Sequence, residues 1–214
     1  MNIVITGANR GIGRAMAELY RAEGHSVIGT ARDGSEAVTL DVAQPNTVAP
    51  ALASVAQGTV DLLVCNAGVY LDKGQSPDTG YPAAMWAETF AVNVTGAFLT
   101  IQALLPALRR SQAGKIAIIS SQMASDTRAP GGSYIYRASK AAVLNLGRNM
   151  AVDLKSDGIA VGIYHPGWVQ TDMGGAAADI DVGQSATGLV ARFDALGLET
   201  TGCFETWDGR AHPY

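Results

Sequence analysis

Residues 2–13 read NIVITGANRGIG, and this stretch decides the fold. Its apolar start, residues 2–6, predicts a buried β-strand, and the glycines that follow lead into a helix that we expect at residues 11–23. Glycines at such a turn let the backbone approach a phosphate, and the first amides of the helix, together with its dipole, attract one. The stretch therefore predicts a nucleotide-binding turn, formed by Gly7, Asn9, Arg10, Gly11, Ile12 and Gly13.

The rest of the chain repeats this alternation of strand and helix. The expected strands are apolar at successive positions, which indicates burial on both faces and hence a parallel sheet. Repeated strand–helix–strand units predict an α/β fold: a Rossmann-type, doubly wound parallel sheet of about seven strands with helices on both faces. No linker divides the chain, so we expect one domain over residues 1–214. We expect strands at 2–6, 26–30, 37–40, 61–65, 115–120, 159–164 and 202–206, and helices at 11–23, 47–56, 83–110 (with a kink near Pro106), 136–155 and 182–195.

The composition excludes several function classes. The net charge is −4, whereas a protein that binds nucleic-acid phosphates is expected to be basic. Two cysteines, Cys65 and Cys203, favour reduced thiols in a cytoplasmic protein, and the start of the chain shows no targeting segment. No set of His, Cys and Asp has metal-ligand spacing, so we expect no metal site.

One stretch has nearly the length that crosses a bilayer. No charged side chain lies between Glu88 and Arg109. However, Asn93, Gln102 and Pro106 interrupt the apolar run. We therefore expect a helix that is buried in the core or in a subunit interface, and no membrane partner.

A tyrosine and a lysine are spaced for acid–base chemistry. Tyr136 and Lys140 lie four residues apart, so they project from one face of the expected helix. A phenol with a pKa of about 10 transfers protons poorly at neutral pH, and lowering this pKa to about 7 requires roughly 4 kcal/mol. An ammonium about 4 Å away contributes a similar energy at an effective dielectric constant near 20. Lys140 is therefore a cation of the right strength to make Tyr136 a working acid or base.

The choice of cofactor follows from the charges after the second expected strand. An enzyme that uses NAD needs an acidic residue there for the ribose 2′-hydroxyl, and one that uses NADP needs a cation for the 2′-phosphate. Residues 29–31, directly before Arg32, include no acidic residue, and Arg10 in the glycine turn is a second guanidinium that we expect beside it. Asp33 offsets part of this charge. The pattern favours NADP(H) over NAD(H).

Six motifs occur in an order that is typical of one enzyme superfamily. They are Thr6-Gly7-x3-Gly11-Ile12-Gly13, Asn66-Ala67-Gly68, Asn93, Ser120-Ser121, Tyr136-x3-Lys140 and Pro166-Gly167. From residue 2 to about residue 173 the chain resembles the short-chain dehydrogenase/reductase superfamily. Within it, residues 133–142 and 165–173 resemble the branch of C-factor-like and sniffer-like carbonyl reductases.

The resemblance implies a role for each matching residue. Tyr136 is implied as the general acid in carbonyl reduction and the base in alcohol oxidation. Lys140 is implied to lower the pKa of Tyr136 and to hydrogen-bond the nicotinamide ribose, while Asn93 orients its helix and a water that leads to Lys140. Ser121 is implied to hold the substrate carbonyl oxygen. The implied cofactor contacts are Asp41 and Val42 (adenine), Asn66, Ala67 and Gly68 (adenine ribose), and Pro166, Gly167, Val169 and Thr171 (nicotinamide).

The serine of this set has a competitor. Ser121 lies 15 residues before Tyr136, which is longer than the usual family spacing, and Ser125 offers a shorter one. We prefer Ser121 because it follows the fifth strand, where sheets of this kind present ligand-binding groups.

Two classes of function remain open, and the reduction of a quinone or pteridine stays within the chemistry of the first. The first is an oxidoreductase that transfers a hydride between NADP(H) and a small carbonyl or secondary-alcohol substrate. The second is a signalling or regulatory protein of the same fold that binds the cofactor with little turnover. The apolar helices at residues 83–110 and 136–155 also predict a homodimer or homotetramer, because one face of each is not needed to cover the sheet.

Overall fold

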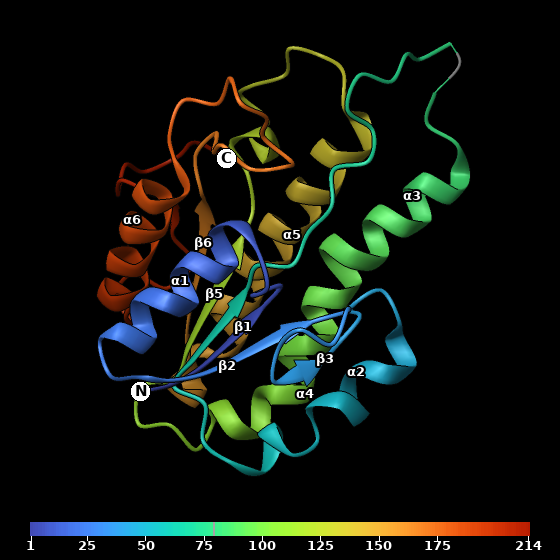
Figure 1. The fold of residues 1–214 in the computed structure, drawn as a ribbon. Helices are drawn as coiled ribbons and strands as arrows, with labels where there is room; N and C mark the ends of the chain where they lie inside the picture. Colours follow the sequence, from blue (N-terminus) through green and yellow to red (C-terminus); the bar gives the residue numbers. More distant parts are fainter. Residues whose placement is uncertain (79) are drawn as a thin grey trace.

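Seven parallel strands form one sheet at the centre of the computed structural model, which describes residues 1–78 and 80–214 (Figure 1). The strand order is β3-β2-β1-β4-β5-β6-β7, which is the doubly wound arrangement expected from the sequence. Most strands lie within a residue or two of the expected ranges. Their bounds are β1 Asn2–Thr6, β2 Ser26–Ala31, β3 Val38–Thr39, β4 Leu62–Cys65, β5 Lys115–Ile119, β6 Ala160–His165 and β7 Phe204–Thr206.

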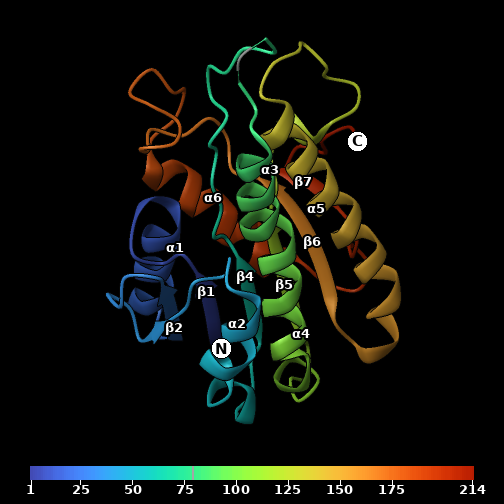
Figure 2. The same cartoon turned by 90° about the vertical axis from the view of Figure 1, so that its right-hand side faces the viewer.

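The order of the strands reverses at β1. This strand pairs in parallel register with β2 on one side and with β4 on the other, so the chain first runs outward to β3 and then returns. Such a reversal leaves a crevice at the carboxyl ends of the central strands. Because all strands are parallel, the loops that follow β1, β4, β5 and β6 meet at this one edge (Figure 2).

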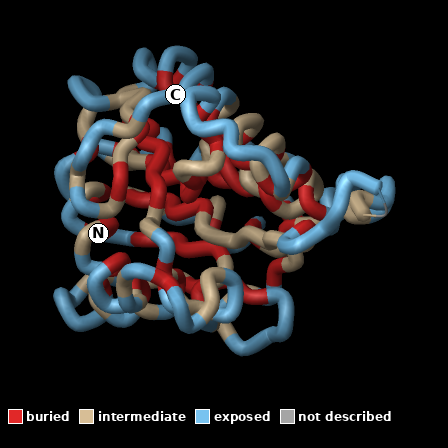
Figure 3. Tube along the Cα trace, turned by 90° about the horizontal axis from the view of Figure 1, so that it is seen from above, coloured by how far each residue is buried: buried red, intermediate tan, exposed pale blue. Residues whose placement is uncertain are grey.

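Helices cover both faces of the sheet. On one face α1 (Gly11–Ala22) packs beside α6 (Val182–Ala195), and on the other lie α2 (Pro45–Leu52), α4 (Ala97–Leu108) and α5 (Tyr134–Asp153). Buried residues gather along the central strands and exposed ones around the periphery (Figure 3). The continuous apolar runs of the strands are thus explained by a core on each side of the sheet.

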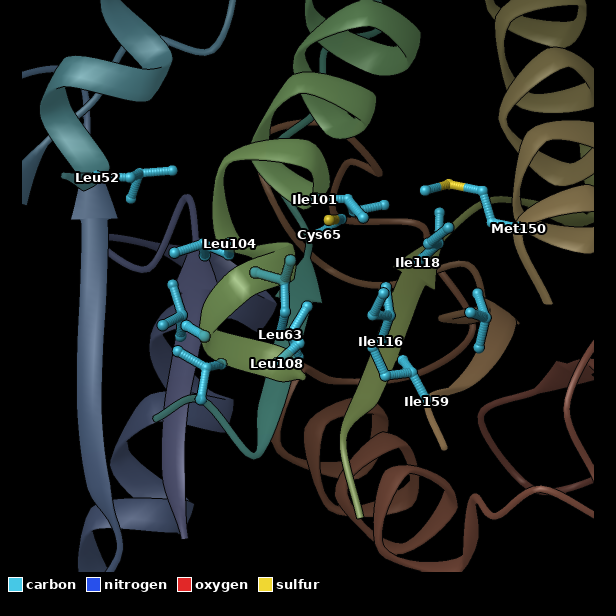
Figure 4. Close-up of a cluster of buried hydrophobic side chains, with 14 of the residues drawn as sticks. Leu52, Leu63, Cys65, Ile101, Leu104, Leu108, Ile116, Ile118, Met150 and Ile159 are labelled. Atoms are coloured by element: carbon cyan, nitrogen blue, oxygen red, sulfur yellow. The ribbon is translucent and has the colours of Figure 1, made fainter. Parts of the chain in front are cut away.

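The larger core lies under α4. Ile101, Leu104 and Leu108 of this helix are fully buried, and they belong to one apolar cluster with Leu63 and Ile116 of the sheet (Figure 4). Cys65 belongs to the same cluster, and burial raises the pKa of its thiol to about 12. Both cysteines are free.

The long helix expected at residues 83–110 is interrupted. It consists of α3 (Ala83–Phe90), a π-helical segment η2 (Ala91–Gly96) and α4, which continues through Pro106 to Leu108. Residues 83–108 are long and apolar enough to cross a membrane by length and composition, a test that core helices also pass. The departure from α-helical geometry therefore falls around Asn93, where π-helical turns often serve a site.

Candidate active site

The glycine-rich turn between β1 and α1 has the geometry of a phosphate cradle. Gly7 and Gly11 have φ angles of 65° and 53°, in the left-handed region that favours glycine. A Cβ on Gly13 would lie 2.2 Å from the carbonyl oxygen of Gly7, so only glycine fits where the helix meets the turn. No side chain caps α1, and its first turn holds no acidic residue. Its free amides and positive dipole end fit a dinucleotide pyrophosphate.

Asn66 holds this turn in place from the end of β4. Its side-chain amide donates to the carbonyl oxygens of Thr6 at 2.9 Å and Gly7 at 3.1 Å. The hydroxyl of Thr6 accepts from the backbone amides of Asn66 and Ala67, each at 3.0 Å. Asn66 and Ala67 thus shape the cofactor side of the crevice through the backbone of the glycine turn.

Arg10 has a partner in the structure that the sequence did not predict. We expected Arg10 beside Arg32. The guanidinium of Arg10 instead donates to the carboxylate of Asp172, in the loop after β6, at 2.9 Å. Both side chains are mostly exposed, so this ion pair stabilises the fold little. Arg32 is exposed after β2, and Asp33 accepts from the Asn9 amide at 2.9 Å. The pairing of Arg10 joins positions 162 residues apart, which no local pattern reveals.

The two residues expected at the adenine differ in exposure. Asp41 is half-buried and its carboxylate accepts from the amide of Ala43 at 3.0 Å, which forms a local turn. Val42 is 8% exposed and belongs to the core beneath α4. Its carbonyl oxygen would lie 2.6 Å from a Cβ on Gly96, so the π-helical segment passes directly against it.

Ser121, Tyr136 and Lys140 meet at the carboxyl end of β5. All three are buried, and the Lys140 Nζ lies 5.6 Å from the centre of the Tyr136 ring. This Nζ donates to the carbonyl oxygen of Ile119 at 2.9 Å, and the Ser120 hydroxyl donates to the carbonyl oxygen of Lys140, also at 2.9 Å. The end of β5 and the first turns of α5 are therefore tied together by the side chains of both.

The electrostatics of the pair differ from the expectation. Burial raises the pKa of the Tyr136 phenol above its ordinary value, while hydrogen bonding from Ser121 lowers it. Burial also lowers the pKa of Lys140 to about 8. We expected the ammonium to bring the pKa of Tyr136 near neutrality, but in this structure burial is the largest effect on the pKa of both groups.

Asn93 links three parts of the site from within the π-helical segment. Its Oδ1 accepts from the amide of Val69 at 2.9 Å, and its Nδ2 donates to the carbonyl oxygen of Val69 and to the Ser139 hydroxyl, each at 3.0 Å. A Cβ on Gly68 would lie 3.3 Å from Asn93 Oδ1 and 3.5 Å from Lys140 Nζ. Asn93 thus lies beside Lys140 and fixes the loop after β4 against α5.

The geometry favours Ser121 over Ser125. The hydroxyl of Ser121 accepts from the Met123 amide at 3.1 Å and lies within reach of Tyr136. Ser125 instead bonds the Thr127 hydroxyl at 2.8 Å and the carbonyl oxygen of Tyr214 at 3.1 Å. Its side chain is thus engaged with the C-terminal residue.

The loop after β6, where we expect the nicotinamide, faces the glycine turn. Gly167 has a φ angle of 90°, and the carbonyl oxygen of Pro166 accepts from the Ser185 hydroxyl at 2.6 Å. A Cβ on Gly11 would lie 3.5 Å from the Thr171 methyl group, so this loop faces the glycine turn. Val169 is buried. One continuous segment opposite the glycine turn therefore holds the four expected nicotinamide contacts, Pro166, Gly167, Val169 and Thr171.

Two residues at the site carry no signal in the sequence. The Tyr70 ring stacks on Tyr136 with centroids 4.2 Å apart, and Asp72 is fully buried against the start of α5. Neither belongs to a motif, and a lone tyrosine or aspartate in a polar loop predicts nothing by itself. Within residues 1–78 and 80–214, no group of three His, Cys, Asp or Glu is placed to hold a metal ion.

Comparison with known proteins decides the family. The family model described as short chain dehydrogenase matches residues 1–180. The chain belongs to the short-chain dehydrogenase family. The C-signal protein of Myxococcus xanthus is 38% identical to it over 162 residues, which cover 75% of this chain and 96% of that protein.

Solved structures of carbonyl reductases share the whole architecture. The NADPH-bound carbonyl reductase from chicken fatty liver has a TM-score of 0.90 and 28% identity, covering 100% of this chain and 98% of that one. The carbonyl reductase Sniffer of D. melanogaster has a TM-score of 0.90 and 26% identity, covering 100% and 99%. This short-chain dehydrogenase is thus an NAD(P)-dependent oxidoreductase of the branch that holds C-signal and the sniffer-like carbonyl reductases.

Proposed function

We propose that this short-chain dehydrogenase transfers a hydride between NADP(H) and a small carbonyl or secondary-alcohol substrate, using Ser121, Tyr136 and Lys140. The observation that carries the proposal is the buried convergence of these three side chains at the carboxyl end of β5. They lie on the same sheet edge as the glycine-rich phosphate cradle. A reacting group and a cofactor bound there share one crevice.

Tyr136 is the general acid of the proposed reduction. Its phenol donates a proton to the carbonyl oxygen of the substrate, and in the reverse direction the phenolate accepts the proton of the alcohol. Ser121 donates a hydrogen bond to the same oxygen and so orients the carbonyl. A bound nicotinamide cofactor supplies the hydride chemistry.

Lys140 supports the acid from the next turn of α5. Its ammonium stabilises the phenolate that remains after proton donation, and we assign it the ribose hydroxyls of the nicotinamide half. With a pKa of about 8, most of this group is charged at neutral pH. Asn93 keeps the π-helical segment and Ser139 in register with it.

The preference for NADP(H) is proposed from charge. Arg32 follows β2, where the adenine ribose binds in folds of this kind, and residues 29–31 directly before it include no acidic residue. Arg10 joins it when the guanidinium leaves the exposed pair with Asp172, which costs about 1 kcal/mol or less. The chicken carbonyl reductase of the same architecture was solved with NADPH bound, which supports this choice.

The remaining contacts complete the proposal. We assign Asp41 and Val42 to the adenine, Asn66, Ala67 and Gly68 to its ribose, and Pro166, Gly167, Val169 and Thr171 to the nicotinamide. The proposed function involves no nucleic acid, membrane or metal. A cytoplasmic location remains a prediction.

A second function has one observation in its favour. The relative from Myxococcus xanthus is named C-signal, so a cofactor-binding signalling protein with little turnover is the competing proposal. The presence of all of Ser121, Tyr136 and Lys140 favours the enzyme, because cofactor binding alone does not need a proton donor.

Steady-state kinetics separate the two proposals. Initial rates of cofactor oxidation are measured with NADPH and with NADH over a panel of ketones, aldehydes and quinones. The enzyme proposal expects turnover of some panel members with a higher kcat/KM for NADPH. Tight NADPH binding, measured by calorimetry, without turnover of any panel member would favour the signalling protein.

A further inference from the structure

A cavity that the proposed function leaves unused lies beside the active site. Its volume is about 400 Å³, which is within the range of small-molecule sites. It is formed at the carboxyl ends of β5, β6 and β7, where His165 and Thr206 are the last residues of their strands. Gln122 in its wall follows Ser121 directly, and Gly167 is an expected nicotinamide contact. The cavity is therefore placed to take a part of the substrate that extends beyond the reacting carbonyl.

The wall of this cavity contains a guanidinium that is not paired with a carboxylate. Arg128 lines it from the loop after β5, and its Nη1 donates to the side-chain oxygen of Gln122. Among the residues that the structure describes, Arg128 forms no salt bridge. The second arginine of the wall, Arg210, is paired with Asp208 at 2.8 Å, and Asp179 is the acidic residue of the lining. An anionic ligand would therefore find its cation at Arg128.

His165 adds a buried imidazole with an unsatisfied ring nitrogen. The residue is 7% exposed, and its Nδ1 has no hydrogen-bond partner in the part of the chain that the structure describes. Burial lowers the pKa of this group to about 3, with His212 and Arg128 acting in the same direction, so the imidazole is neutral at physiological pH. A neutral imidazole donates one hydrogen bond and accepts another. A buried polar atom without a partner is costly, which is consistent with a partner that a ligand supplies.

Two indole rings form an apolar part of the wall. Trp168 is 45% exposed, and its Nε1 donates to the carbonyl oxygen of Gly174 at 2.9 Å, which fixes the ring on the loop after β6. Trp207 is half-buried, and a Cβ on Gly167 would lie 3.0 Å from its ring. Indole rings offer a large and rigid apolar contact area. The cavity thus combines an apolar surface with the guanidinium of Arg128.

We propose that this cavity binds a carboxylate group of the substrate, so the carbonyl compounds that this enzyme reduces carry a carboxylate on an apolar body. The planar guanidinium of Arg128 matches a carboxylate in shape and in charge. One unpaired cation beside a neutral imidazole suits a monoanion better than the double charge of a phosphate. The substrate class rests on the proposed function, whereas the binding of a carboxylate in the cavity does not.

The first test needs no turnover. The chain has three tryptophans, of which Trp168 and Trp207 line the cavity, while Trp86 lies on α3, outside the lining. The indole N–H signals of isotope-labelled protein are recorded by NMR during a titration with benzoate, which joins a carboxylate to a planar apolar ring. We expect the signals of Trp168 and Trp207 to shift and that of Trp86 to stay, with single Trp→Phe variants giving the assignment. Benzamide, the neutral analogue, should bind at least about tenfold more weakly.

The same titration tests the charge of Arg128. In Arg128→Ala we expect the benzoate affinity to fall about tenfold or more, while Arg128→Lys, which keeps the charge, should keep part of it. Arg109→Ala is the matched control, because it removes an exposed arginine that pairs with Asp157 outside the cavity lining, and it should leave the affinity unchanged. The inference is overturned by unshifted cavity indoles, by equal affinities for benzoate and benzamide, or by wild-type affinity in Arg128→Ala. Tighter binding of inorganic phosphate than of benzoate would also overturn it.

The second test concerns the substrate class. Reduction with NADPH is compared between oxo-carboxylates of increasing length and their methyl esters, which share the carbonyl and the carbon skeleton and differ in charge. In at least one pair we expect kcat/KM to be about tenfold or more higher for the acid, and Arg128→Ala should bring this ratio close to one while Arg109→Ala keeps it. A ratio near one for every pair in an active wild type contradicts the inference and leaves the proposed function standing. If the wild type reduces no carbonyl compound, the proposed function fails, and the benzoate titration still decides whether the cavity binds a carboxylate.

Discussion

Lys140 is a buried cation of the candidate site, and burying its charge costs stability. Its ammonium donates to the carbonyl oxygen of Ile119, and burial lowers its pKa to about 8, against about 10.4 in an unfolded chain. Below pH 8 both states hold the proton, so the cost of burying the charge is fully present. Between about pH 8 and 10.4 the unfolded state binds more protons, so the stability of the ligand-free protein should rise.

Replacing this lysine should therefore stabilise the ligand-free protein. For Lys140→Met we expect a gain of about 2 kcal/mol at pH 7, because a shift of this size is worth about 3 kcal/mol and the lost hydrogen bond offsets about 1. The gain should shrink toward pH 10. Urea unfolding at pH 7 and pH 10 measures it, and a variant less stable than the wild type at pH 7 contradicts the burial cost.

Arg32 should discriminate between the two cofactors. In Arg32→Ala we expect NADPH affinity to fall ten- to a hundredfold, about 1.5–3 kcal/mol, because one charge-assisted phosphate contact is lost. NADH affinity should change little. Arg10→Ala is the comparison, with a smaller effect because this guanidinium must first leave Asp172. Calorimetric titration of both cofactors measures the ratio, and equal losses for both would remove Arg32 from the 2′-phosphate.

At the scale of elements, the turn between β1 and α1 is limited by space. In Gly13→Ala the added Cβ would meet the backbone oxygen of Gly7 at 2.2 Å, and a backbone atom does not move aside easily. We expect a loss of about 1–3 kcal/mol in stability and a larger loss of cofactor affinity. Gly197→Ala is the control, since nothing lies within 4 Å of its added Cβ. Thermal unfolding with and without NADPH measures both effects, and equal behaviour of the two variants would refute this role of the turn.

Most of the strands, helices and turns could be predicted from the sequence. The parallel sheet follows from strands that hold apolar residues at successive positions, and the glycine turn from its place between a strand and a helix. The helix at residues 83–110 shows the limit. Its apolar pattern predicts one continuous helix, whereas the structure has a π-helical segment at Ala91–Gly96, from which Asn93 bonds to Val69 and Ser139. These partners are brought close only by the folded chain.

Some residues of the candidate site could likewise be predicted from the sequence, whereas others could not. Tyr136, Lys140 and Ser121 carry a spacing or a position at a strand end that chemistry can interpret. Asp72 caps a helix that starts more than 60 residues later, and Arg10 pairs with a residue on a distant loop. Such contacts have no local pattern, because they depend on which loops the sheet brings to one edge.

At the scale of the whole molecule, apolar side chains remain on the outer face of the long helix and of α5. Trp86 and Phe98 are each 37% exposed and Val152 is 75% exposed. Exposed apolar groups on neighbouring helices favour self-association, so the homodimer or homotetramer remains our prediction. Light scattering at micromolar concentration measures it. A mass of twice or four times 22.1 kDa is expected, and a mass of 22.1 kDa contradicts it.

The most direct measurement of the central claim is the turnover of Tyr136→Phe. The ring still packs against Tyr70, so cofactor binding should stay within a few-fold of the wild type while only the proton donor is lost. With a carbonyl substrate that the wild type reduces, we expect the NADPH-dependent rate to fall by at least about two orders of magnitude. A variant that binds NADPH normally and keeps near-full reductase activity would show that Tyr136 is not the acid and would contradict the account.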